Sequence, residues 1–226
     1  MVIISIYFGG VFMFDFINLD FTTFTAFLFA ALVISIIPGP DVAFVVSRSI
    51  AGGKKVGIAT AFGMQLGIMF HILLAAFGLS AILMTSALAF QIVKYIGAAY
   101  LIYLGIQTIR DKKGININVQ EDHGGMRKAF WQGAITDIFN PKVALFFLTF
   151  LPQFISPDQG NTFFQFIFLG VIFGLLGLII DICYSLIADW FRNVLAKNQT
   201  MMKWQKRVSG FTLIGLGTLL AFEKRS

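Results

Sequence analysis

The sequence has few charged residues and only one cysteine. Asp, Glu, Lys and Arg make up 12% of its 226 residues, against roughly 25% in soluble domains, and 58% of the residues are hydrophobic. This balance excludes an ordinary soluble domain and predicts an all-α protein that crosses the lipid bilayer several times. The single cysteine, Cys183, excludes an internal disulfide, and its apolar neighbours predict a small buried residue rather than a ligand or nucleophile.

Patterns that mark enzymes and metal sites are also absent. With two histidines and one cysteine, the chain has no zinc-binding spacing, and no nucleophile–base pattern appears. We therefore expect no catalytic residue, metal or cofactor, and an intramembrane enzyme is the least favoured alternative. The net charge of +6 does not indicate a nucleic-acid partner, because the basic residues lie in loops between the apolar runs.

The chain is organised around a break in its first long apolar run, Pro38-Gly39-Pro40-Asp41. The two prolines lack a backbone N–H and glycine has little preference for helical dihedrals, so the helix should open here. Opened backbone at bilayer depth persists only where it is buried in protein or lines a wet cavity. The ionisable Asp41 at the same place marks a candidate substrate or ion pathway.

A second break follows later in the chain, at Asn140-Pro141-Lys142. Pro141 removes a donor, Asn140 is pushed out of the α region, and Lys142 places a cation at membrane depth. We expect Lys142 to pair with Asp41 when no substrate is bound, since an isolated charge at this depth costs at least a few kcal/mol. The other polar residues singled out within the spans are Gln65, His71, Asp137 and Asp181.

We predict six spans arranged as two three-helix repeats. After an N-terminal extension over residues 1–20, the first repeat covers residues 21–113, a connecting loop covers 114–127, and the second repeat covers 128–226. The first and fourth spans are the broken ones, and both breaks read Pro-x-Val-Ala followed by a bulky apolar residue. Because each repeat makes an odd number of crossings, its two copies must be inverted, as in many secondary transporters. Matching broken segments then point to a transport site between them.

Basic residues lie mainly on one side of this topology. Thirteen of the 17 Lys and Arg residues follow the first, third and fifth spans. The positive-inside rule then places both termini of this multi-pass protein outside the cytoplasm.

The order and spacing of several motifs resemble the LysE-type translocators, the lysine exporter superfamily, and specifically its homoserine/threonine resistance (RhtB-type) branch. The resemblance covers most of the chain. It implies a bacterial-type cytoplasmic (inner) membrane protein that exports amino acids or derivatives, of the homoserine, threonine, small neutral or basic class, energised by an ion gradient, with H⁺ as the expected coupling ion. The matching motifs are Pro38-Gly39-Pro40-Asp41, Gly52-Gly53-Lys54-Lys55-x-Gly57, Gly63-x-x-x-Gly67, the run from Gly97 to Gly105, Asn140-Pro141-Lys142 and Leu151-Pro152-Gln153-Phe154.

The two breaks offer complementary groups for an α-amino acid. Half-helix N-termini and Lys142 suit its carboxylate, while Asp41 and unwound carbonyl groups suit its ammonium. The expected substrate site comprises Pro38, Gly39, Pro40, Asp41, Gln65, Asp137, Asn140, Pro141 and Lys142. The candidates for carrying a coupling proton are Asp41, Asp137, Asp181 and His71. A channel for ions or small solutes and an exporter of another metabolite remain alternatives, and homo-oligomerisation stays open.

Overall fold

The computed structural model describes residues 21–81, 87–110 and 125–190, with single positions and adjacent pairs between 207 and 222. The elements in these ranges are all helices, which confirms the all-α fold class. The predicted extension over residues 1–20, most of the connecting loop and most of the sixth span lie outside the described residues. Helix α6 begins at Gly125, within the stretch that the sequence assigns to the connecting loop.

Two bent helix pairs occupy the places of the predicted broken spans. Helix α1 (Phe21–Ile36) meets α2 (Pro40–Gly52) at an angle of 48°. Helix α6 (Gly125–Ile138) meets the segment Pro141–Phe154 at 44°. That segment consists of α7 (Pro141–Leu145), the π-helical turn η2 (Phe146–Phe150) and the 3-10 turn η3 (Leu151–Phe154). Both bends therefore lie where the prolines interrupt the apolar runs.

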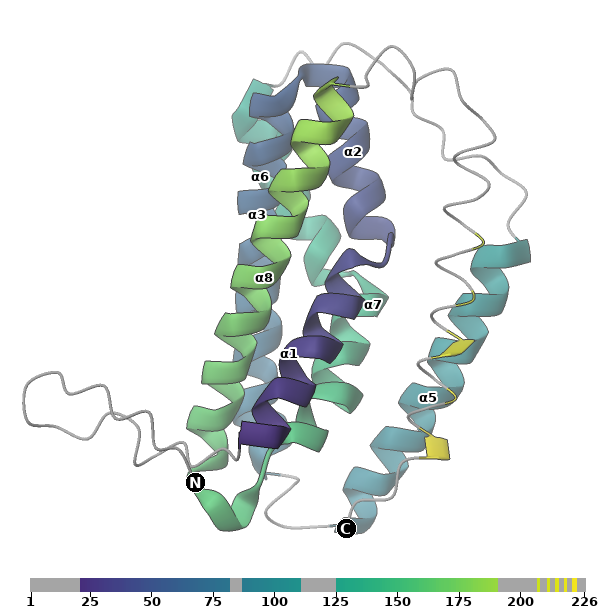
Figure 1. Ribbon diagram of the computed structural model, residues 1–226, viewed down its shortest axis with the longest axis vertical. Helices are drawn as coiled ribbons and strands as arrows, with labels where there is room; N and C mark the ends of the chain where they lie inside the picture. The colour runs from purple at the N-terminus through teal and green to yellow at the C-terminus, as the bar shows by residue number, and fades with distance from the viewer. Residues whose placement is uncertain are drawn as a thin grey trace, which may run out of the picture.

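Two continuous helices complete the bundle. Helix α3 (Lys54–Leu74) extends through the π-helical turn η1 (Ala75–Leu79), and α8 (Thr162–Trp190) follows the short 3-10 turn η4 (Pro157–Gln159). Both are long and apolar enough to cross a membrane, and the described residues contain up to four spans if each bent pair is one span. The six-span inverted repeat thus remains a prediction. Helix α5 (Ala87–Arg110) lies beside the bundle, where it contacts α7 and η2 (Figure 1).

The two bent pairs run in opposite directions along the bundle. Helix α2 ends, and α3 and α6 begin, at the end of the bundle where α8 also ends, at the top of Figure 1. At this end the Lys54 backbone N–H donates to Asp189 Oδ1 over 3.1 Å, which ties the start of α3 to the end of α8. The first bent pair runs toward this end and the second runs away from it. The two breaks therefore approach one another partway along the bundle.

Glycine residues allow α3 and α6 to pack with their backbones in contact. A Cβ atom on Gly63 would overlap the carbonyl oxygen of Phe130, and a Cβ atom on Gly67 would lie 2.6 Å from Asp137 Cβ. Small residues of this kind let helices approach closely in lipid, where no hydrophobic effect drives them together. In this protein the close approach presses Asp137 against α3.

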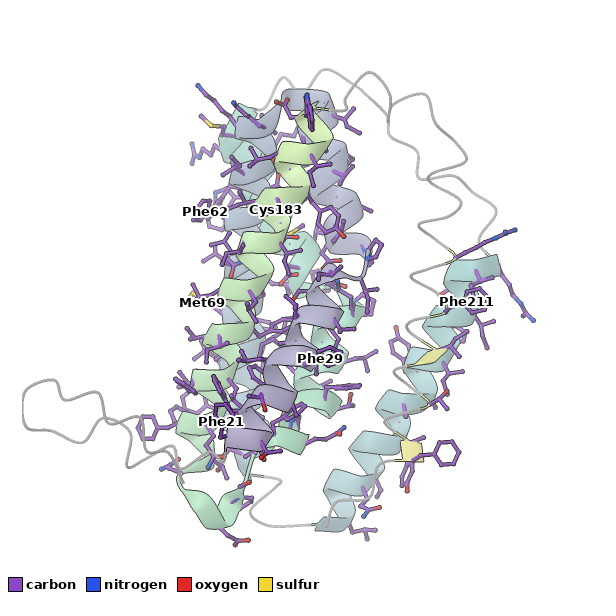
Figure 2. The ribbon with its side chains drawn as sticks, viewed as in Figure 1. Phe21, Phe29, Phe62, Met69, Cys183 and Phe211 are labelled. Carbon is purple, nitrogen blue, oxygen red and sulfur yellow. The ribbon has the colours of Figure 1, made fainter. Side chains whose placement is uncertain are left out.

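The outer surface of the bundle is apolar. Phe29 is 71% exposed, Phe62 49% and Met69 55%, and Figure 2 shows all three side chains pointing away from the bundle. An apolar exterior of this kind is suited to lipid rather than to water. Cys183 is exposed on this surface as well, so the prediction that it is buried was wrong. Helix α8 turns Asp181 and Ser185 inward, which leaves Cys183 on its outer face.

An aromatic cluster fills the part of the bundle formed by α1, η2 and the first half of α8. The rings of Phe146 and Phe173 stack with centroids 4.0 Å apart, and Phe147 meets Phe173 edge to face at 5.6 Å. Phe27 and Phe166 are fully buried in the same core. We call these five phenylalanines the aromatic core.

Candidate functional site

The break in the first bent pair leaves carbonyl groups of α1 without their usual helical partners. In a continuous helix, the N–H groups of residues 38 and 40 would bond to the carbonyls of Ile34 and Ile36, but both residues are proline. Gly39 between them is extended, with φ −124° and ψ −166°. The last turn of α1 therefore presents acceptors that groups from other helices must satisfy.

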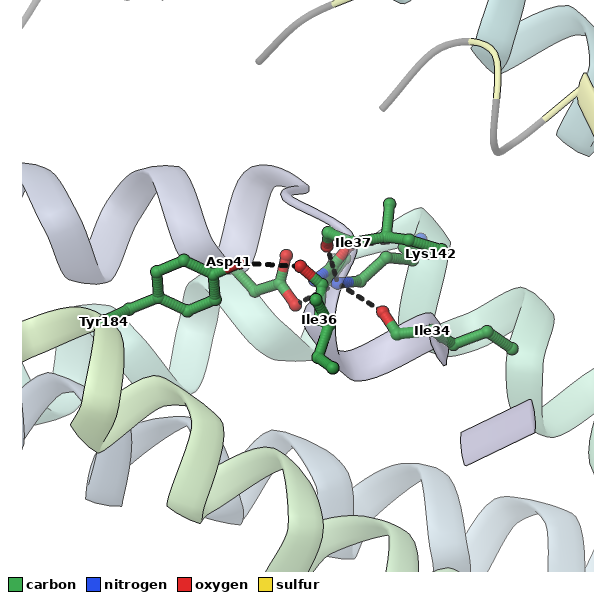
Figure 3. Close-up of polar contacts among 7 residues, drawn as sticks. Ile34, Ile36, Ile37, Asp41, Lys142 and Tyr184 are labelled. Carbon is green, nitrogen blue, oxygen red and sulfur yellow. Dashed lines mark hydrogen bonds and ion pairs between the residues drawn. The ribbon is translucent and has the colours of Figure 1, made fainter. Parts of the chain in front are cut away.

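Two side chains from the second half of the chain satisfy these acceptors (Figure 3). Lys142 Nζ donates to the carbonyl of Ile37 over 3.1 Å and to that of Ile34 over 3.4 Å. The hydroxyl group of Tyr184 on α8 donates to the carbonyl of Ile36 over 2.7 Å. The two acceptors that the prolines leave free, Ile34 and Ile36, are therefore both occupied.

Lys142 also forms the ion pair that the sequence led us to expect. Its Nζ atom lies 2.5 Å from Asp41 Oδ2, and the exposed fractions of the two side chains are 5% and 12%. Gly39 packs against this pair, since a Cβ atom there would lie 2.6 Å from Asp41 Oδ1 and 3.2 Å from the Lys142 side chain. Any larger residue at position 39 would disturb the pair.

The second break holds Lys142 in place. Asn140 has an extended backbone, and its Oδ1 atom accepts a hydrogen bond from the Lys142 backbone N–H over 3.1 Å. This is an N-cap, and Pro141 at the first position of α7 needs no hydrogen-bond donor. The cap fixes the start of α7 so that the Lys142 side chain reaches across to the end of α1.

The helix ends around the ion pair match its charges. Lys142 Nζ lies at the C-terminus of α1, where the helix dipole is negative, and Asp41 lies in the first turn of α2, where it is positive. Both charges are thus stabilised by backbone as well as by each other. A substrate with one positive and one negative group would meet the same two helix ends.

Two further carboxylates lie near the pair. Asp137 on α6 and Asp181 on α8 are 2% and 7% exposed, and both interact electrostatically with Asp41 and Lys142. Asp41 Oδ1 and Asp137 Oδ2 are buried without a hydrogen bond of ordinary length and angle. The centre of the bundle therefore contains more carboxylates than ammonium groups, and two of its carboxylate oxygens are available to accept a hydrogen bond.

The predicted residues on α3 occupy different positions. His71 is buried, stacks on Phe147 at 5.9 Å and lies with Nε2 3.2 Å from the carbonyl oxygen of Asp137. It thus contacts the second break directly. Gln65 faces α8 near Gly174, and in the described part of the chain no hydrogen bond joins it to the ion pair.

Tyr184 was missed by the sequence analysis. It lies three residues after Asp181, which places both on neighbouring turns of one helix. A tyrosine within an apolar span is also common at membrane surfaces and in cores, so the residue type alone does not reveal the contact. Only the structure, in which the Ile36 carbonyl faces α8, shows the contact with Tyr184.

The apolar exterior, the two broken helix pairs and the ion pair between them define an integral membrane protein of the transporter class. The sequence profile of the LysE type translocators matches residues 32–224. The chain belongs to the LysE type translocator family, which confirms the resemblance seen in its motifs.

Known relatives match this chain over nearly all of its length. An uncharacterized membrane protein of Vibrio cholerae is 30% identical over 91% of this chain and 100% of its own. The membrane protein YrhP of Bacillus subtilis is 32% identical over 85% of this chain and 95% of its own. The homoserine/homoserine lactone efflux protein of Salmonella typhimurium is 30% identical over 90% of this chain and 98% of its own. No solved structure matches the fold.

Proposed function

We propose that this protein exports small α-amino acids or their derivatives, of the homoserine and threonine class, across a bacterial-type cytoplasmic membrane. The observation that carries the proposal is the buried Asp41–Lys142 ion pair between the two broken helices. The homoserine/homoserine lactone efflux protein of Salmonella, with which the chain aligns almost end to end, supports the substrate class.

An amino-acid zwitterion can replace the contacts of this ion pair one for one. Its ammonium group binds Asp41 and the carbonyls at the end of α1, and its carboxylate binds Lys142 and the N-terminus of α2. The net charge of the site does not change in this exchange. Such an exchange limits the cost of separating two buried charges, which amounts to several kcal/mol when one partner is removed without replacement.

The balance of charges in the centre of the bundle supports proton coupling. Among the described residues, Lys142 is the one buried Lys or Arg, whereas Asp41, Asp137 and Asp181 are all buried acids. Full ionisation would leave two carboxylates without a buried cation, at high cost in a membrane interior. Protons are the simplest charges to neutralise them, and Asp137 and Asp181 are the carriers we propose, with His71 beside Asp137 as a further candidate.

The orientation that we propose follows from the basic helix ends. The ends of α2 and α8 and the beginnings of α3 and α6 share one end of the bundle (Figure 1). Arg48, Lys54, Lys55, Arg127 and Lys128 belong to these helix ends. The positive-inside rule puts this end in the cytoplasm, so that both chain termini lie outside it.

The test is efflux from proteoliposomes loaded with labelled homoserine, threonine, lysine or leucine, with and without an imposed pH gradient. We expect saturable efflux of one chemical class, accelerated by the gradient, and the acceleration should disappear when a protonophore collapses the gradient. Asp41→Asn should retain folding and lose efflux. The matched control is Asp158→Asn, which changes an exposed aspartate in η4 and should transport like the unaltered protein.

Other outcomes separate the alternatives. Efflux that does not saturate, together with electrical conductance, would indicate a channel for ions or small solutes. Saturable transport of none of the four amino acids by folded protein would indicate another metabolite. Unchanged efflux by Asp41→Asn would remove the ion pair from the substrate site.

A further inference from the structure

The ammonium group of Lys142 sits among oxygen atoms of the kind that bind alkali cations. Its three neighbours are Asp41 Oδ2 at 2.5 Å, the Ile37 carbonyl at 3.1 Å and the Ile34 carbonyl at 3.4 Å. One carboxylate and two carbonyls of an unwound helix form a ligand set with which broken-helix transporters hold sodium. No nitrogen or sulfur ligand takes part among these contacts.

We propose that Lys142 is a built-in substitute for a sodium ion, and that shortening its side chain turns the oxygen cage at the end of α1 into a sodium site. The unaltered carrier then needs no sodium, because its cation is tethered to α7. This inference deepens the proposed function, because it excludes sodium as the coupling ion. The efflux measurement described below rests on that function.

The cage requires a positive charge for reasons that do not depend on Lys142 itself. Pro38 cannot supply an N–H to the Ile34 carbonyl, and the negative end of the α1 dipole points at the same spot. Asp41 adds a full negative charge, and Gly39 leaves no side chain that could fill the space. Removing the Lys142 amine therefore leaves a buried carboxylate and two carbonyls that attract a cation.

The neighbouring groups strengthen this preference. Asp137 and Asp181 are close enough to interact electrostatically with Asp41 and Lys142, and each adds negative potential when it is ionised. Tyr184 occupies the Ile36 carbonyl, so that the end of α1 keeps its shape without Lys142. The cage is thus held by elements other than the lysine that fills it.

The experiment compares the unaltered protein and three variants by thermal unfolding in 150 mM sodium chloride and in 150 mM choline chloride. Lys142→Ala opens the cage and keeps Asp41, Lys142→Met fills the space without a charge, and the double variant Asp41→Asn with Lys142→Ala opens the cage without its carboxylate. We expect sodium to raise the midpoint of Lys142→Ala by about 3–6 °C, the shift for a tenfold excess over the dissociation constant in a chain of this size. The unaltered protein and the other two variants should show no sodium-specific shift.

Two results would overturn the proposal. One is a Lys142→Ala protein whose midpoint is the same in both salts, or that fails to fold even in sodium. The other uses the unaltered protein alone: efflux driven by a pH gradient should run at the same rate in sodium and in choline, and a requirement for sodium would contradict a tethered cation. The unfolding shift needs no substrate, so it can succeed where the proposed export activity fails, and the two ideas are judged separately.

Discussion

The centre of the bundle and the aromatic core beside it are held together by different kinds of contact. In the centre, charged and polar groups meet unwound backbone, and Asp41, Lys142 and the α1 carbonyls each have a partner that another ion could replace. In the aromatic core, rings such as Phe146 and Phe173 stack directly on one another, and its five members are all phenylalanines. In the function that we propose, the first region exchanges its contacts with a substrate, and the second region does not.

This difference has a physical origin in the membrane. Helices in lipid gain little from hiding apolar surface, so that a close fit between side chains supplies most of the apolar stabilisation. The aromatic core therefore acts as a rigid support, and it reaches the site through Phe147, whose ring stacks on His71. In the function that we propose, this rigid support would hold the helices in place while groups at the breaks exchange ion-pair and hydrogen-bond partners with the substrate.

The largest effect should come from breaking the ion pair. Lys142→Met leaves Asp41 buried without its cation and frees two carbonyls, so we expect the free energy of unfolding to fall by about 3–5 kcal/mol. Denaturant unfolding in detergent measures the loss. The matched control is Lys55→Met at an exposed position, which should change stability by less than about 0.5 kcal/mol.

A double-mutant cycle isolates the pair itself. Adding Asp41→Asn to Lys142→Met removes the uncompensated charge and should restore much of the lost stability, without restoring efflux. A double variant that is as unstable as the sum of both single variants would show that Asp41 and Lys142 are not coupled.

The next largest effect should come from the aromatic core. Phe146→Ala removes a ring that stacks on Phe173, and we expect a loss of about 2–3 kcal/mol, below the 3–5 kcal/mol typical of soluble cores because the hydrophobic contribution is small in lipid. Folded protein should still discriminate between amino acids as before. Phe29→Ala, at a side chain that is 71% exposed, is the control and should have little effect on stability. A change of substrate preference in Phe146→Ala alone would show that the aromatic core is part of the site.

The sequence predicted the breaks well because proline acts locally. Pro38, Pro40 and Pro141 remove backbone donors wherever they stand in a helix, and the bends of 48° and 44° lie at these residues. The ion pair could be predicted because a charge buried at membrane depth is costly unless an opposite charge lies beside it. The family followed from the order of the motifs around the breaks.

Other features depend on how each helix is rotated about its own axis, and the sequence gives little information about that rotation. Helix α8 is apolar on nearly every side, so that little in its sequence tells which face is buried, and Cys183 and Tyr184 were misjudged or missed for that reason. The two π-helical turns, at Ala75–Leu79 and Phe146–Phe150, were not predicted; the first contains a single glycine, Gly78, and the second contains neither proline nor glycine.

A smaller effect should come from separating α3 and α6. Gly63→Ala forces a methyl group onto the carbonyl oxygen of Phe130, and we expect a loss of about 1–3 kcal/mol, as in other overpacked contacts. Gly78→Ala is the matched control in the same continuous helix, because a Cβ atom there would meet nothing within 4 Å. The control should be neutral or stabilised by up to about 1 kcal/mol through its better helix propensity. Equal stability of both variants would mean that the α3–α6 contact is not close in the membrane.

The smallest effect should come from Tyr184, whose hydroxyl bonds to the Ile36 carbonyl beside the ion pair. Tyr184→Phe removes only that hydroxyl, and we expect a loss of about 0.5–1.5 kcal/mol in the free energy of unfolding, the range for one hydrogen bond. Tyr103→Phe on the exposed surface of α5 is the control. Because the hydroxyl holds the end of α1 where Lys142 binds, the variant should also slow efflux several-fold while keeping the substrate preference. A Tyr184→Phe protein with unchanged stability and unchanged efflux would show that the Ile36 carbonyl finds another donor. Tyr184 would then not belong to the group of contacts that the substrate exchanges, which would extend only as far as Lys142.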